Sequence, residues 1–108
     1  MESAVEIVVI DQFVVPPDAM SEFVETSRKV QTVLKTLPGF VEGFVYRKRD
    51  GDGRHNVITT AVWHSEDAYK SARNAMAAAL QSLAPNPQAV MRNLGVEIER
   101  GVFERTPF

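Results

Sequence analysis

The sequence predicts one α+β domain over residues 1–108, with strands and helices in the order β-α-β-β-α-β. Four segments rich in valine, isoleucine and phenylalanine read as strands, and two longer segments repeat apolar residues at helical spacing. Prolines and glycines stand between these segments, where chain breaks are expected. The chain contains no cysteine, but 108 residues are enough to bury a core without disulfide bonds.

The first part of the chain predicts a strand followed by a helix. The strand spans Val5 to Val15 and is largely apolar on both faces, so cover is expected on both sides. Pro16 and Pro17 end it, and Asp18 suits the start of a helix. Pro38 ends that helix, because proline disfavours helical geometry at the residue before it. Apolar residues recur along the helix at near-helical spacing: Met20, Phe23, Val24, Val30, Val33, Leu34 and Leu37.

A β-hairpin is predicted in the middle of the chain. Its strands are residues 40–50 and 55–64, and between them Gly51 and Gly53 can adopt the positive φ that a turn requires. Strict alternation assigns the residues of each strand to faces. One face of the first strand is expected to carry Phe40, Glu42, Phe44 and Tyr46, and one face of the second Val57, Thr59, Ala61 and Trp63.

A second helix and a last strand complete the order. Ser65 is a suitable N-cap, with Glu66 and Asp67 in the favourable first turn. One stripe of this helix, expected over residues 65–83, is formed by Tyr69, Ala72, Met76, Ala79, Leu80 and Leu83. The prolines of residues 84–87 end the helix, a short helix is expected over residues 88–94, and the last strand spans residues 96–105.

This order is that of a ferredoxin-like fold, an antiparallel sheet with both helices on one face. The other face would carry aromatic and β-branched residues, which is a larger apolar patch than a monomer normally exposes. We therefore expect a homodimer in which two sheets face each other as a barrel.

Charge and hydropathy argue against two classes of partner. The formal net charge is −2, and the basic residues of the hairpin are interrupted by Asp50 and Asp52, so no nucleic-acid interface is expected. No stretch approaches the roughly 18 apolar residues of a membrane span. No signal peptide is expected either, and a cytoplasmic protein is the default.

Residues 37–72 resemble the antibiotic biosynthesis monooxygenase family of the dimeric α+β barrel superfamily. The shared pattern is a helix ending in Pro-Gly-Phe, a strand, a polar turn, and a strand that closes on Trp-x-Ser before an acidic and aromatic helix start. In this sequence the pattern is carried by Pro38, Gly39, Phe40, Trp63, Ser65, Glu66 and Tyr69. The resemblance implies one pocket per subunit, between helices and sheet, with no cofactor and no metal ion.

Members of that family differ in chemistry, and the residues discriminate between two branches. Haem-degrading members use an Asn, a Trp and a His, whose places are taken here by Asp11, Ala72 and Ser82. The expected helix 65–83 contains no histidine, so it cannot supply an axial haem ligand. The branch that oxidises polycyclic phenols and quinols pairs a strand-end Trp with a Tyr six residues later, as Trp63 and Tyr69 do.

By this resemblance, a small aromatic phenol or quinol would be oxidised by dioxygen without a cofactor. Tyr69 would hydrogen-bond the substrate oxygen, and the indole N–H of Trp63 would donate to a developing oxyanion. Thr59 stands where the oxygenases have an Asn, so it keeps a hydroxyl but lacks the amide. The residues expected to contact the substrate are Thr59, Phe13, Phe44, Ala72 and Met76.

Alternatives stay open at several of these positions. Trp63 and Tyr69 could equally fill the core, as an aromatic pair at such a junction often does. Asp11 lies in an otherwise apolar strand; it acts as a general base, is exposed near the strand's edge, or pairs with an arginine such as Arg100. His55 and His64, at the two ends of a strand, are expected to be exposed. A dimeric ligand-binding or stress-related domain without catalysis is the second functional hypothesis, and an isomerase or lyase of the same superfamily is the third.

Overall fold

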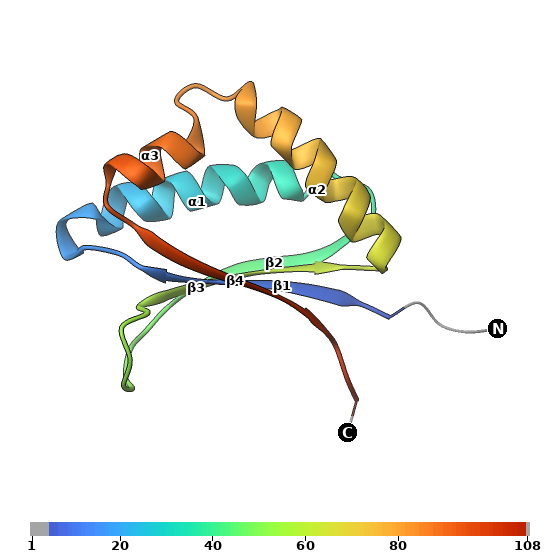
Figure 1. Ribbon diagram of the computed structural model, residues 1–108, viewed down its shortest axis with the longest axis horizontal. Coiled ribbons are helices and arrows are strands. Elements are labelled where there is room, and N and C mark those ends of the chain that lie inside the picture. The colour runs from blue at the N-terminus through green and yellow to red at the C-terminus, as the bar shows by residue number, and fades with distance from the viewer. Residues whose placement is uncertain (1–4, 108) are drawn as a thin grey trace.

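The computed structural model describes residues 5–107 and has a four-stranded antiparallel sheet with all helices on one face (Figure 1). The predicted fold class is confirmed, including the short third helix. The elements are β1 (Ile7–Val14), a 3-10 turn (Pro17–Ala19), α1 (Met20–Leu34), β2 (Phe40–Arg47), β3 (Val57–Trp63), α2 (Glu66–Gln81), α3 (Pro87–Asn93) and β4 (Glu97–Glu104).

The strand order of the sheet is β2-β3-β1-β4, so the first strand is central and the last is an edge. Residues directly opposite each other in antiparallel strands project to the same face. Asp11 of β1 is opposite Thr59 of β3 and Arg100 of β4. These three residues therefore form a polar row across the face that the helices cover, and we call it the polar row.

The predicted face assignment of β2 is wrong for Phe40. The pairing of β2 with β3 shifts between Phe40 and Glu42, so Val41 is an extra residue of the β-bulge type. The bulge turns Phe40 to the helix-covered face, where its ring meets Trp63 edge-on at a centroid distance of 5.4 Å. Phe44 and Tyr46 stay on the opposite face, because alternation resumes after the bulge. A prediction that assumes strict alternation from Phe40 does not allow for an extra residue.

The start of α2 is fixed by two local contacts. Ser65 has extended backbone, and its hydroxyl accepts a hydrogen bond from the Ala68 amide at 3.1 Å, which confirms the predicted N-cap. Gly39 has a φ of 84°, and a Cβ at this position would collide with Ala68 Cβ. Only glycine therefore lets the turn before β2 approach the first turn of α2 so closely.

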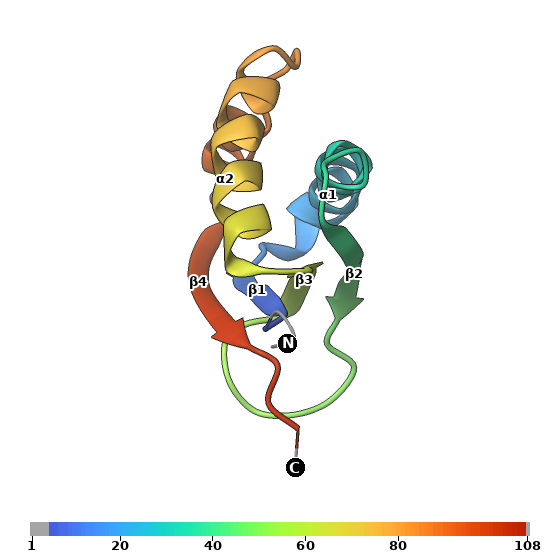
Figure 2. The same cartoon turned by 90° about the vertical axis from the view of Figure 1, so that its right-hand side faces the viewer.

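Beyond this anchored end, α2 rises away from the sheet, whereas α1 runs along it (Figure 1). Figure 2 shows α1 above the β2 side of the sheet and α2 above the β4 side. The middle of β4 is thus left without a close helix, and its helix-facing residues Ile98, Arg100 and Val102 are all exposed.

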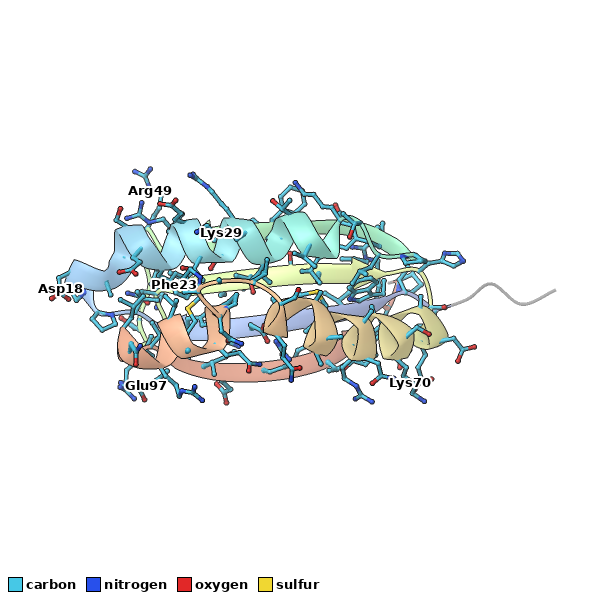
Figure 3. All side chains as sticks on the ribbon, turned by 90° about the horizontal axis from the view of Figure 1, so that it is seen from above. Asp18, Phe23, Lys29, Arg49, Lys70 and Glu97 are labelled. Carbon is cyan, nitrogen blue, oxygen red and sulfur yellow. The ribbon has the colours of Figure 1, made fainter. Side chains whose placement is uncertain are left out.

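The helix-covered face carries two hydrophobic clusters, one on each side of the polar row. The Phe23 cluster contains Phe13, Val15, Ala19, Phe23 and Val57. The Trp63 cluster contains Val9, Ala61, Trp63 and Ala72, with Leu34, Phe40 and Tyr69 packed against it. In Figure 3, Phe23 lies in the half of the molecule that α3 covers.

The opposite face of the sheet is uncovered by any helix within residues 5–107 (Figure 2). Large apolar side chains are exposed there: Phe44, Tyr46, Ile58 and Phe103. The ring of Phe103 folds over Gly101, whose missing side chain leaves it room. Among the described helices, none combines the length and the apolar character that crossing a membrane requires.

Candidate functional site

A pocket of about 290 Å³ lies between α1, α2 and the helix-covered face of the sheet. It exists because α2 diverges from the sheet and because the side chains at its narrow end, Ala61 and Ala72, are small. Val30 and Leu34 of α1 form one wall, and Met76 and Leu80 of α2 form the other. This volume is at the lower end of the range of about 300–1,000 Å³ that is typical of small-molecule sites.

Trp63 and Tyr69 both line the pocket. Trp63 is only 2% exposed. Tyr69 projects from the first turns of α2, and the guanidinium carbon of Arg73 lies 5.6 Å from the centre of its ring. The two aromatic residues pack in the Trp63 cluster and also border the cavity, so the core interpretation and the site interpretation both apply to them.

The polar row crosses the floor of the pocket. Arg100 donates from Nε to Oδ1 of Asp11 at 2.7 Å and from Nη2 to Oδ2 at 2.8 Å. The Asp11 side chain is 12% exposed, whereas that of Arg100 is 58% exposed and reaches the mouth of the pocket. The predicted pairing of Asp11 with Arg100 is therefore confirmed. A role for Asp11 as general base stays a prediction.

Arg100 is a permanent cation at this site. Its hydrogen bonds to Asp11 raise the pKa of the guanidinium above the usual value; desolvation opposes the rise, and the charge of Asp11 and the nearby Tyr69 add to it. Arginine is already protonated at all ordinary pH values, so the shift does not change its charge state. Arg100 is therefore always positively charged, and the buried carboxylate of Asp11 fixes the orientation of its guanidinium.

The structure also places the other predicted site residues. Thr59, Ala72 and Met76 line the pocket, and their contact with a substrate stays a prediction. Phe13 does not, because it lies beyond the polar row and packs edge-on against Phe23 at a centroid distance of 4.9 Å. Phe44 does not either, because it projects from the opposite face of the sheet. Both predicted substrate contacts are therefore corrected.

The two histidines lie outside the pocket lining. Nε2 of His55 is 3.4 Å from a carboxylate oxygen of Glu99, so this histidine is half-buried beside an acidic partner rather than exposed. His64 is exposed at the end of β3, as expected. Neither histidine is positioned to exchange a proton with a molecule in the pocket.

Five polar residues that were not predicted also line the pocket: Gln31, Thr60, Arg73, Gln88 and Arg100. Arg73 could have been found, because it follows Tyr69 by one helical turn. For Arg100 the sequence predicts only a pairing with Asp11. Gln31 carries no signal in the sequence; its amide donates to the Thr60 carbonyl at 3.4 Å, while its buried Oε1 has no partner among the described residues.

The model of the antibiotic biosynthesis monooxygenase family matches residues 6–80. This chain belongs to that family. The match includes Asp11, Trp63, Tyr69 and Arg73 of the pocket, whereas Arg100 follows it in β4.

Solved structures from several organisms share the fold of this monooxygenase-family chain. A variant of SnoaB, a cofactor-independent oxygenase from Streptomyces nogalater, is 26% identical, with 95% of each chain covered and a TM-score of 0.72. A protein from Shewanella loihica PV-4, provisionally called a monooxygenase, is 19% identical over 100% of each chain, with a TM-score of 0.75.

A dimeric ferredoxin-like protein from an uncultured marine organism is 11% identical, covering 96% of this chain and 98% of its own, with a TM-score of 0.70. The second and third likenesses show the fold alone. No protein with a curated description matches the chain. Membership of the monooxygenase family therefore rests on the match over residues 6–80, and the fold is independently supported.

Proposed function

We propose that this member of the antibiotic biosynthesis monooxygenase family is a cofactor-independent oxygenase that oxidises a small aromatic phenol or quinol with dioxygen. The observation that carries the proposal is the pocket itself, in which Trp63 and Tyr69 border an apolar cavity beside a fixed cation. The likeness to the oxygenase SnoaB supports the same reaction class.

The proposed reaction inserts one oxygen atom of dioxygen and reduces the other to water. The bound phenol loses its proton, and the electron-rich phenolate transfers one electron to dioxygen. The radical and superoxide combine at a ring carbon to form a carbon–oxygen bond, and a proton completes the hydroperoxide. Loss of water then breaks the oxygen–oxygen bond and leaves the quinone. Overall, a phenol with a free ring position and one O₂ give a quinone and one H₂O.

The chain's own groups would assist this sequence by stabilising negative charge. The Trp63 N–H and the Tyr69 hydroxyl can donate to the phenolate oxygen, and the nearby Arg100 favours the anion electrostatically. Both oxygens of Asp11 already accept hydrogen bonds from Arg100. We therefore assign Asp11 the positioning of Arg100, and assign acceptance of the phenol proton to a water molecule inside the pocket.

Oxygen uptake with a panel of anthrones and hydroquinones tests this proposal. Tyr69→Phe removes one hydroxyl from the pocket, and we expect kcat to fall by about tenfold to a hundredfold. Tyr46→Phe is the matched control, because Tyr46 lies on the opposite face of the sheet, and it should keep the wild-type rate. Absence of oxygen uptake across the panel, while the same compounds still raise the melting temperature, would instead support a non-catalytic binding domain.

We also propose a homodimer formed through the uncovered face of the sheet. The exposed side chains of Phe44 and Tyr46, 50% and 52% exposed, lie beside Ile58 on this face. An apolar surface of this kind is normally buried by association. Sedimentation velocity should give a dimer for the wild type and a monomer for Tyr46→Glu. Lys29→Glu on the outer side of α1 is the control and should stay dimeric; a monomeric wild type at micromolar concentration contradicts the proposal.

A further inference from the structure

We propose that the substrate of this pocket carries a carboxylate, which Arg100 and Arg73 bind at the mouth while the aromatic ring lies between α1 and α2. The proposal rests on the proposed function for the identity of the site, and it adds the chemical class of the ligand. It is carried by the charges of the pocket lining, the geometry of Arg100 and the position of Arg73.

The pocket lining has an excess of positive charge. Three charged side chains line it: Asp11, Arg73 and Arg100. Asp11 and Arg100 neutralise each other as an ion pair, so one positive charge remains. The walls are apolar, and charges near such surfaces interact more strongly than charges in open water. A neutral ligand would leave this charge uncompensated, whereas a monoanion would match it.

Arg100 binds Asp11 with only one edge of its guanidinium. The Nε and Nη2 atoms donate to the two carboxylate oxygens, which is the side-on arrangement. Arginine has five N–H donors, and three of them, on Nη1 and Nη2, have no acceptor among residues 5–107. Two of these lie on the end-on edge, whose spacing fits a second carboxylate. Asp11 thus orients Arg100 so that this edge stays free.

Arg73 supplies the second cation. It lies one helical turn after Tyr69 on α2, and its guanidinium is 5.6 Å from the ring centre, within the range of a cation–π contact. This contact holds the side chain beside the pocket. Among the described residues it forms no ion pair with a carboxylate, in contrast to Arg54, which is bound to Glu97 at 2.7 Å.

The two ends of the pocket are therefore chemically different. Trp63, which is 2% exposed, borders the buried end, whereas Arg100 and Arg73, the latter beside the ring of Tyr69, are exposed. A planar molecule with a phenolic oxygen at one end and a carboxylate at the other satisfies both. Such an arrangement also fixes the direction in which the ring enters, so that the oxygen to be ionised reaches Trp63 and Tyr69.

A matched pair of ligands tests this inference by binding alone. Anthraquinone-2-carboxylate and anthraquinone-2-carboxamide have the same shape and differ in charge, and quenching of Trp63, the only tryptophan, reports on occupancy. We expect the carboxylate to bind about tenfold to a hundredfold more tightly, as for charge-assisted hydrogen bonds, and the preference to shrink in high salt.

Arg73→Gln and Arg100→Gln should each reduce that preference by about tenfold and change carboxamide binding by less than about twofold. Arg92→Gln is the matched control, because Arg92 is exposed in the last turn of α3 and does not line the pocket. If Arg100→Gln fails to fold, Arg73→Gln decides the question, since Arg73 is an exposed helix residue.

Equal affinity for the two compounds would overturn this inference and leave the oxygenase proposal intact. A carboxylate preference without any oxygen uptake would support this inference and count against the oxygenase. If neither compound binds, the pocket does not accept such rings, and this inference is overturned whatever the uptake assay shows with other substrates.

Discussion

The Phe23 cluster and the Trp63 cluster cover the same face of the same sheet, but only one of them is filled. In the first, Phe13 and Phe23 interlock, Phe23 is 0% exposed, and the 3-10 turn and α3 close the end. In the second, alanines take the central places and α2 diverges, so about 290 Å³ stays open. The polar row of Thr59, Asp11 and Arg100 separates them.

This difference shows how a small domain can combine stability with a cavity. An empty apolar space forgoes dispersion contacts and costs free energy of unfolding. Here that cost falls in the half of the sheet that borders the pocket, while in the other half Phe13 and Phe23 pack against each other and are buried. Substitutions in the Phe23 cluster should therefore mainly change stability, and substitutions along the pocket should mainly change ligand binding.

Phe23→Ala should have the largest effect on stability. The side chain is fully buried in the filled cluster, so its loss should lower the free energy of unfolding by about 3–5 kcal/mol. Urea unfolding followed by Trp63 fluorescence measures this change. A loss below about 1 kcal/mol would show that the Phe23 cluster is not the stabilising half.

Gly39→Ala should come next, because it strains the contact that anchors α2. The residue has a φ of 84° and its Cβ would meet Ala68, so we expect a loss of about 2–3 kcal/mol and weaker ligand binding through displacement of the pocket wall. The double variant Gly39→Ala with Ala68→Gly relieves the contact but keeps the backbone strain, and it should recover part of the loss. If Gly39→Ala costs as much in the Ala68→Gly background as in the wild type, φ alone sets the cost.

Met76→Ala should have the smallest effect on stability and a clear effect on binding. Met76 is half-buried on the pocket wall, so its truncation should cost about 1 kcal/mol, well below the value for a fully buried methionine. Affinity for a bulkier aromatic ligand should rise, because the cavity widens. A stability loss as large as that of Phe23→Ala would break the distinction between the two clusters.

The sequence predicts most of the fold because its signals are local. Strand ends, the Ser65 cap and the prolines after α1 and α2 each have a nearby cause. The bulge at Val41 is not predictable from β2 alone, because an extra residue is defined only by the pairing of β2 with β3. Phe44 shares a face with Glu42 and Tyr46, as predicted, but that face is the one without helices.

The candidate site was predictable only in part. Trp63, Tyr69, Thr59, Ala72 and Met76 follow from the motif and the helical stripe, and they do meet at one cavity. Phe13 shares their face of the sheet, but its position beyond the polar row depends on how three strands align. The tilt of α2, which opens the pocket, arises from packing along the whole helix, so no short segment of sequence encodes it.

The divergence of α2 also bears on how such proteins change over time. The helix is fixed to the sheet at its N-terminal end only. The size of the side chains along the rest of the helix therefore determines its distance from the sheet, and the sheet itself need not change. Relatives could then bind a different ligand after substitution of a few large side chains on this one helix. The strands of the sheet, which stabilise the fold, would then keep their sequence.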